Sequence, residues 1–172
     1  RLLWRSTDFD GLKTGHTKEA GYCLVASGMR NGTRLVSVVM GAPTDMARAN
    51  DSQALLNYGF RFYETHLLFS ANQALSNPRI WMGQQKHVAM GLSNNLYVTI
   101  PTGRYKNLKA DMSLQPKLTA PILKGQRYGQ VVVKLGNKVI ATRPLIAFTA
   151  DNRGGMFTRM GDHIALFFKG WF

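Results

Sequence analysis

A lysine, a threonine and a glycine follow one another near the start of the chain, at Lys13, Thr14 and Gly15. On an inner strand such a lysine can bind a substrate carboxylate or lower the pKa of a neighbouring nucleophile, because its charge stabilises a nearby anion. The other interpretation is a solvated lysine on an edge strand. A bare triplet also arises by chance in roughly a few per cent of chains of this length. Residues 10–17 alone leave both interpretations open.

Cysteine and histidine offer little further chemistry. Cys23 is the only cysteine, which excludes an internal disulfide or a cysteine-cluster metal site. It lies in an apolar run, so we expect a buried, unreactive thiol. The four histidines show neither HxxxH nor HxH spacing. We therefore predict no metal site and no cofactor.

The net charge of +13 is concentrated in one part of the 172 residues. Residues 67–150 hold eleven Lys and Arg but one acid, Asp111, a balance of +10. Such a region attracts a polyanion, which can be nucleic acid, an anionic lipid surface or an acidic polymer. Nucleic acid is disfavoured because the aromatic residues there are scattered and form no stacking platform.

The elements that must position the lysine are a small sheet and a helix. Alternating apolar residues predict strands over 9–14, 21–27 and 34–40, and Asn31-Gly32 is typical of a hairpin turn between the last two. A helix is expected from about residue 45 to 64, with Thr44 as a possible N-cap. Its packing stripe is predicted to contain Met46, Ala49, Gln53, Leu56 and Phe60, flanked by Leu55 and Tyr63.

From residue 67 onward the apolar period changes to two. Strands are predicted over 96–100, 108–114, 130–135 and 138–142, which indicates a small β-sandwich or barrel. Four prolines are expected at breaks between strands: Pro101, Pro116, Pro121 and Pro144. The domain boundary is expected near residues 65–70.

The end of the chain is expected to form an amphipathic helix of about 17 residues, separated from the sandwich by Gly154-Gly155. A helix of this length is too short and too polar to span a bilayer. It can pack on the sandwich or lie in a membrane interface. We favour the interfacial anchor because aromatic residues accompany Lys and Arg at the extreme end. The predicted anchor side chains are Phe157, Ile164, Phe167, Phe168, Trp171 and Phe172.

Several stretches in order along the chain resemble the D-alanyl-D-alanine carboxypeptidases. The resemblance begins with the K-T-G stretch at residues 10–17, continues through 20–27, 34–41 and 55–64, and extends through 98–103 and 143–145 to Trp171-Phe172. The chain is most similar to the C-terminal portion of the low-molecular-mass penicillin-binding proteins of the 5/6 type. K-T-G is one of three motifs in such enzymes, after S-x-x-K and S-D-N.

This resemblance implies an α+β fold in three parts. Residues 1–66 would supply the C-terminal strands and helix of a penicillin-recognising serine transpeptidase-like catalytic domain. Residues 67–152 would form the β-sandwich, and residues 153–172 the amphipathic membrane-anchor helix. The implied protein lies peripherally on the periplasmic face of the bacterial cytoplasmic membrane, whose anionic surface the C-terminal helix would bind.

The implied activity removes the terminal D-alanine from peptidoglycan stem peptides through an acyl-enzyme, which β-lactam antibiotics would also form. Lys13 would supply positive potential, Thr14 would bind the terminal carboxylate, and Gly15 would leave room for substrate. The backbone N–H of His16 would contribute to the oxyanion hole. Arg48 would assist carboxylate recognition, the alternative being a solvated arginine.

One departure from the family pattern bears on activity. No serine in the printed sequence is followed three positions later by lysine, and the two S-x-N triplets, at Ser70 and Ser93, come after K-T-G. We therefore expect these 172 residues to be inactive alone. A β-lactamase is disfavoured because a sandwich-length segment follows the predicted helix. The alternative from another class is a non-catalytic module that binds a membrane surface or cell-wall polymer.

Overall fold

The computed structural model describes residues 6–169, with side-chain surroundings as far as Phe167. The predicted anchor residues Trp171 and Phe172 lie outside the described residues, and so does the side chain of Phe168. The chain forms two compact units. Unit 1 comprises residues up to 66 together with 99–106, and unit 2 comprises residues 67–98 together with those from 107 onward.

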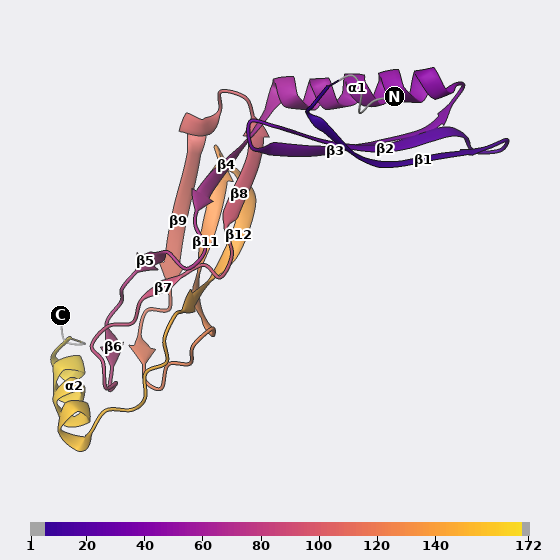
Figure 1. The fold of residues 1–172 in the computed structure, drawn as a ribbon. Helices are drawn as coiled ribbons and strands as arrows, with labels where there is room; N and C mark the ends of the chain where they lie inside the picture. The colour runs from indigo at the N-terminus through magenta and orange to yellow at the C-terminus, as the bar shows by residue number, and fades with distance from the viewer. Residues whose placement is uncertain (1–5, 170–172) are drawn as a thin grey trace. The chain divides into compact units, whose positions relative to one another are not determined.

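Unit 1 is a three-stranded antiparallel sheet covered on one face by a helix. The strands β1 (Phe9–Thr17), β2 (Gly21–Arg30) and β3 (Thr33–Ala42) lie in this order, and α1 (Asp45–Phe62) runs along the sheet (Figure 1). Asn31 and Gly32 turn the chain between β2 and β3 with positive φ angles of 48° and 77°, as a tight hairpin turn requires. The predicted sheet and hairpin are thus confirmed.

The helix α1 begins where the sequence predicts, but its buried face differs. The hydroxyl of Thr44 accepts a hydrogen bond from the backbone N–H of Ala47 at 3.0 Å, which caps the first turn. The residues buried against the sheet are Ala49, Ser52 and Leu56, whereas Met46 and Leu55 are exposed. The predicted end was also wrong, because Tyr63 leaves the helix and starts strand β4 (Tyr63–Phe69).

The core of unit 1 lies between α1 and the sheet. Leu56 of α1 packs with Phe9, Leu24 and Ala26. Leu35 and Phe60, which are partly buried, pack against this cluster. Burial of Leu56, Leu24 and Phe9 contributes about 1.5–3 kcal/mol each, and it fixes which face of the sheet the helix covers.

Unit 2 is built on a five-stranded sheet in the order β5-β7-β12-β11-β9. Their bounds are Ala74–Ser76 (β5), Met90–Gly91 (β7), Lys138–Ala147 (β12), Arg127–Leu135 (β11) and Leu108–Leu114 (β9). A smaller pair in unit 2 is β6 (Ile80–Trp81) parallel to β10 (Leu118–Thr119). The strands β4 and β8 (Leu96–Pro101) also pair with each other, and each has residues in both units. A single 3₁₀ turn spans Tyr105–Asn107. Apolar side chains of several of these strands form the core: Met90, Leu96, Val98, Val131, Val133 and Leu145.

One proline prediction was wrong. Pro144 lies inside β12, opposite Gln130 of β11, where a strand break was expected. The strand continues for three residues beyond it, and Leu145 and Ala147 are fully buried. Burial of these two side chains therefore favours a continuous strand although Pro144 has no N–H to donate.

The second helix, α2 (Met156–Lys169), follows the sandwich in unit 2. Within the described part of the chain, no helix has both the length and the apolar character needed to cross a membrane. Several large apolar side chains of α2 are exposed to solvent: Met156, Phe157, Met160, Ile164 and Phe167.

Candidate active site

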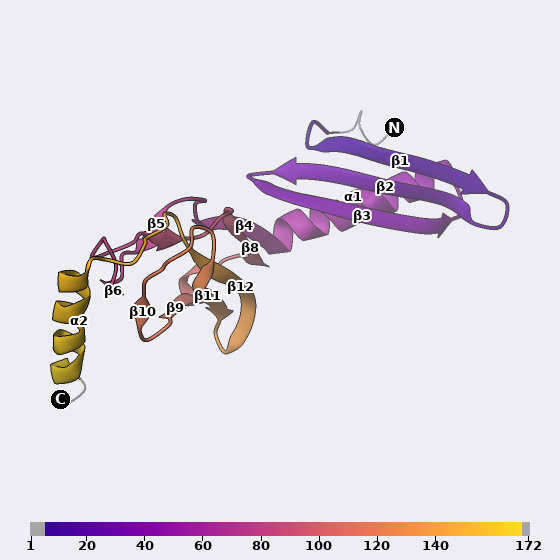
Figure 2. The ribbon, with the colours of Figure 1, turned by 90° about the horizontal axis from the view of Figure 1, so that it is seen from below.

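The K-T-G triplet lies in β1, on an edge of the unit 1 sheet. Among the residues that the structure describes, β1 pairs only with β2, so its outer side is open (Figure 2). Lys13 stands opposite Val25 and Gly15 opposite Cys23 in the register. All residues from Leu12 to Thr17 are exposed. An extended peptide can therefore add to this edge through main-chain hydrogen bonds.

The four predicted site residues of β1 divide between the two faces of the sheet. Thr14 pairs with Leu24, whose side chain packs on α1, so Thr14 and His16 point to the helix-covered face. Lys13 and Gly15 point to the opposite face. The ammonium of Lys13 donates to the carbonyl oxygen of Thr14 at 2.8 Å.

Arg48 of α1 contacts the same strand from the helix-covered face of the sheet. Its Nη1 donates to the carbonyl oxygens of Gly15 at 2.9 Å and Cys23 at 3.0 Å. These two residues face each other across the β1–β2 ladder. With a side chain only 11% exposed, Arg48 binds the backbone at the glycine of K-T-G and holds the strand pair to the helix.

Two neighbours of Arg48 were not singled out for the site from the sequence. Asp45 accepts a charged hydrogen bond from Arg48 Nη2 within the first turn of α1. The ring of Tyr22 lies 5.5 Å from the Arg48 guanidinium carbon and contacts His16 edge-on, with ring centroids 3.9 Å apart. The i, i+3 spacing of Asp45 and Arg48 on a helix was the signal for the first pair. Asp45 also offsets the unfavourable position of a cation near a helix N-terminus.

The strand that carries K-T-G is anchored at its start by two ion pairs. Arg30 binds Asp8 and Arg34 binds Asp10, each at 2.7 Å. The hydrogen bond from Arg30 lowers the pKa of Asp8 below its usual value, and that from Arg34 likewise lowers the pKa of Asp10. The register shifts between Phe9 and Gly11, just before the triplet. Such bulges redirect the side chains that follow them.

Together these features make a site that can bind an anionic, extended ligand. β1 offers an open row of backbone groups, a lysine ammonium and a threonine hydroxyl. Arg48 and the two ion pairs fix the strand. A nucleophile with an adjacent base, which acyl transfer requires, is not among the residues brought together here.

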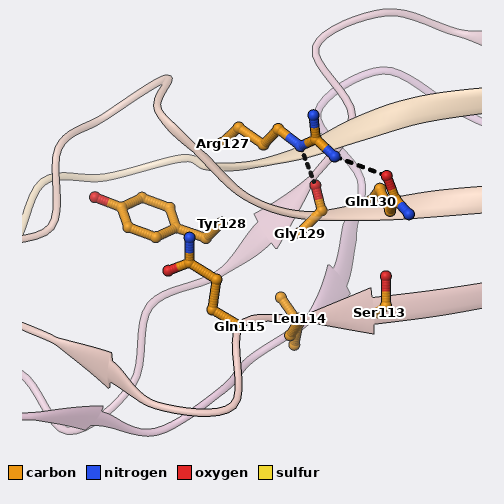
Figure 3. Close-up of a pocket in the computed structure, with 7 residues that line it drawn as sticks. All are labelled: Ser113, Leu114, Gln115, Arg127, Tyr128, Gly129 and Gln130. Atoms are coloured by element: carbon orange, nitrogen blue, oxygen red, sulfur yellow. Dashed lines mark hydrogen bonds between the residues drawn. The ribbon is translucent and has the colours of Figure 1, made fainter.

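A separate cleft of about 360 Å³ lies in unit 2, between the ends of β9 and β11. Figure 3 shows Tyr128 and Gln115 on one side of it and the Arg127 guanidinium directed to the Gly129 carbonyl and the Gln130 amide. The donor–acceptor distances are 3.2 and 2.7 Å. None of its lining residues belongs to the predicted site.

The chain matches two family models. Residues 63–153 match the model described as penicillin-binding protein 5, C-terminal domain. Residues 1–44 match the model described as D-alanyl-D-alanine carboxypeptidase.

Individual relatives match along the whole chain. The chain is 45% identical over 174 residues to D-alanyl-D-alanine carboxypeptidase DacC of Escherichia coli strain K12, covering 100% of the chain and 44% of that relative. It is 40% identical over 173 residues to DacA of the same strain, covering 99% and 43%. The crystal structure of penicillin binding protein 5 from Haemophilus influenzae aligns with a TM-score of 0.82 at 40% identity, covering 88% of this chain and 45% of that one.

The chain thus spans less than half the length of these relatives. The predicted resemblance is confirmed by the family models and by identities of 40–45%. The chain belongs to the D-alanyl-D-alanine carboxypeptidases of the low-molecular-mass penicillin-binding protein 5/6 type, and it corresponds to their C-terminal portion.

Proposed function

We propose that this chain is the C-terminal part of a serine-type D-Ala-D-Ala carboxypeptidase, which removes the terminal D-alanine from peptidoglycan stem peptides. The observation that carries the proposal is the placement of K-T-G on the open edge of β1, held by Arg48 from α1. The names of the relatives support the reaction type. In this assignment residues 1–66 belong to the catalytic domain, 67–152 form a sandwich domain, and 153–172 form an anchor.

Each site residue has a proposed role in acyl transfer. Lys13 provides positive potential beside a serine nucleophile, which the part of the enzyme beyond this chain supplies. Thr14 donates a hydrogen bond to the substrate carboxylate, and Gly15 leaves room for the peptide along the strand. The N–H of His16 stabilises the oxyanion, an interaction of the kind that contributes about 2.7–4 kcal/mol to the transition state. The same nucleophile would be acylated by β-lactam antibiotics.

Arg48 is proposed to assist carboxylate recognition through the strand. The Arg48 guanidinium binds the carbonyls of Gly15 and Cys23. It therefore places positive charge on the helix side of the strand next to Thr14, and it fixes the backbone at Gly15. This makes Arg48 a positioning residue for K-T-G.

The test joins the 172 residues to the upstream portion of the Escherichia coli relative and measures acylation by a fluorescent penicillin. We expect acylation of the fusion and none of the 172 residues alone. Lys13→Ala should lower the acylation rate by roughly 100-fold, the scale of one electrostatic group in such a site. Lys18→Ala is the matched control, since Lys18 is an exposed lysine just after β1. A folded fusion that is not acylated, or equal rates for both variants, would refute the assignment.

A second function is supported by α2 and the charge of unit 2. We propose that the exposed apolar residues of α2 enter the interface of an anionic membrane, on the periplasmic face of the cytoplasmic membrane, where the protein is peripheral. As a non-catalytic module the chain would still bind there. Flotation with phosphatidylglycerol vesicles, with and without residues 155–172, tests this. Equal flotation of both forms would exclude α2 as the anchor.

A further inference from the structure

A carboxylate on α2 is bound by another segment of unit 2 instead of facing solvent. Asp162 accepts a hydrogen bond from Arg79 Nη2 at 2.8 Å through Oδ1, and one from the backbone N–H of Met82 at 2.6 Å through Oδ2. Its side chain is only 13% exposed, whereas that of Arg79 is 47% exposed. Hydrogen bonds to a charged acceptor are among the strongest in proteins.

The loop that binds Asp162 is itself fixed by the segment that precedes α2. We call residues 79–85 the docking loop. Asp151, which is 2% exposed, accepts hydrogen bonds from the backbone N–H groups of Gln84 and Gln85, both at 3.1 Å. Gln84 N–H also donates to the Asn152 carbonyl at 3.0 Å. Two carboxylates, one before α2 and one within it, thus bind the same loop.

The first of the two glycines before α2 is held against the docking loop. The N–H of Gly154 donates to the carbonyl of Met82 at 2.9 Å. A Cβ at Gly154 would lie 2.5 Å from the carbonyl oxygen of Gly83. Glycine at position 154 is therefore required by the close approach of the docking loop, and the chain is held there.

The docked face of α2 lies opposite its apolar face. Successive helix residues are about 100° apart around the axis, so Asp162 lies about 180° from the centre of the stripe formed by Met156, Phe157, Met160, Ile164 and Phe167. These five side chains are 54–80% exposed. Thr158 is next to Gly154, because the added Cβ there would lie 3.2 Å from its Cβ. Docking through Asp162 thus turns the apolar stripe away from the docking loop.

Basic side chains accompany the docked carboxylate. The charge of Lys86 acts on Asp162 together with that of Arg79. Arg79 also stacks on Trp81, with its guanidinium carbon 4.1 Å from the ring centroid. An apolar stripe that faces outward, with cations beside the docked face of the helix, fits an anionic phospholipid surface.

We propose that Asp162 locks α2 onto the docking loop, so that the sandwich and α2 meet an anionic phospholipid membrane as one rigid body. The lock fixes the tilt of the sandwich on the membrane and brings Arg79 and Lys86 to headgroup level. The contact of Asp162 with the docking loop is expected in solution as well. Its role on lipid rests on the proposed membrane association.

The experiment measures distances within unit 2 of the full chain. In a Cys23→Ala background, nitroxide labels at Ser113→Cys and Ala165→Cys report the position of α2 relative to the sandwich by pulsed electron resonance. Asp162→Asn removes the charged acceptor with little change of shape. Asp111→Asn is the matched control, because it removes one carboxylate of an exposed ion pair in the same unit. Each variant is measured in solution and on vesicles of phosphatidylglycerol and phosphatidylethanolamine in equal parts.

We expect one narrow distance distribution for the parent and for Asp111→Asn in both media. Asp162→Asn should raise the fraction of displaced helix about 10-fold or more, as expected for the loss of charged hydrogen bonds. Exchange of the Met82 amide proton should increase by a similar factor. A broad distribution in the parent, or an unchanged one in Asp162→Asn, would overturn the lock. Failure of the parent to bind vesicles would instead refute the membrane association, while the solution distances would still decide the lock.

Discussion

At the scale of single residues, Arg48 links the helix to the chemistry of the strand. One nitrogen binds two backbone carbonyls and another binds Asp45, so the guanidinium joins α1, β1 and β2. Lysine cannot reproduce this pattern, because an ammonium lacks the planar fork of donors. The position of K-T-G therefore depends on a side chain 33 residues away.

Arg48→Ala should loosen the β1–β2 pair at Gly15 and Cys23. The loss of charged hydrogen bonds at a mostly buried site costs about 1.5–3 kcal/mol. Amide exchange in residues 13–16 and 22–24 should rise roughly 10- to 100-fold if opening there is local. Arg61→Ala, an exposed arginine in the last turn of α1, should leave these rates unchanged. Equal exchange in both variants would contradict the positioning role of Arg48.

The Asp162 carboxylate makes a pH-dependent contribution to unit 2. Burial raises its pKa, but the Met82 N–H, Arg79 and Lys86 together outweigh burial, so the pKa lies below its usual value. A carboxyl with a lowered pKa stabilises the folded state above its unfolded pKa of about 4. That contribution is lost as the pH falls through the lower, folded pKa. Thermal unfolding followed down to about pH 2 should show this loss in the parent chain.

The comparison for this pH effect is between two aspartates of unit 2. Asp162→Asn should make the acidic part of the stability curve less steep. Asp111→Asn should not, since the Asp111 side chain is 63% exposed and its ion pair with Lys134 is solvated. A curve for Asp162→Asn as steep as that of the parent would show that the carboxylate does not contribute.

At the scale of elements, close backbone contacts decide the packing of strands. Gly129 of β11 lies against β9 beside the cleft in Figure 3. A Cβ at this position would lie 2.3 Å from the Ser113 carbonyl oxygen and 3.1 Å from the Leu114 Cα. Both contacts are to backbone, which cannot rotate away.

Gly129→Ala should therefore displace the end of β9 from β11. Overpacking of this kind costs about 1–3 kcal/mol, which denaturant unfolding of the full chain can measure. Gly155→Ala serves as the control, because a Cβ there meets nothing within 4 Å. If both substitutions have the same effect, the strand contact is not as tight as the geometry indicates.

The sequence predicted the regular elements better than the contacts between them. Alternation located β1 to β3 and β8, β9, β11 and β12. The burial pattern of these strands alternates strictly only in β8, whereas β9 has no buried side chain although its sequence predicted a strand. Alternation missed β4, since Tyr63 extends the apolar spacing of α1 into the strand. It also missed very short strands such as β6 and β7, which are two residues long. The Asp162–Met82 hydrogen bond joins residues 80 positions apart, and no local pattern marks such a pair.

The same limit applies to the candidate site. K-T-G was recognisable by type and spacing. The pair of Asp45 and Arg48 was missed, although its helical spacing was a signal that could have found it. The contact of Arg48 with two carbonyls was not predictable, because backbone acceptors have no sequence signature. Likewise the burial of Ser52 in place of Leu55 reflects the rotation of α1 on the sheet, which tertiary packing determines.

At the scale of the whole molecule, charge and apolar surface are unevenly distributed. Residues 67–150 have a balance of +10 within a net charge of +13, and the exposed apolar stripe of α2 follows them in the chain. These are two different sources of membrane affinity. Electrostatic attraction weakens as salt shortens the Debye length, from about 30 Å at 0.01 M to about 10 Å at 0.1 M. Insertion of apolar side chains does not depend on salt in this way.

The two sources can therefore be separated by salt and lipid. Vesicle flotation of the full chain on phosphatidylglycerol should weaken at least about 10-fold between 0.01 and 0.3 M salt, since each basic residue near the surface contributes about 1 kcal/mol. Binding to phosphatidylcholine, which has no net charge, should be weaker and nearly independent of salt. Phe157→Ser should reduce binding to both lipids, because it removes an 80% exposed apolar side chain from α2. Binding to the anionic lipid that does not change with salt would mean that the basic surface of unit 2 stands away from the membrane, and that α2 alone carries the affinity.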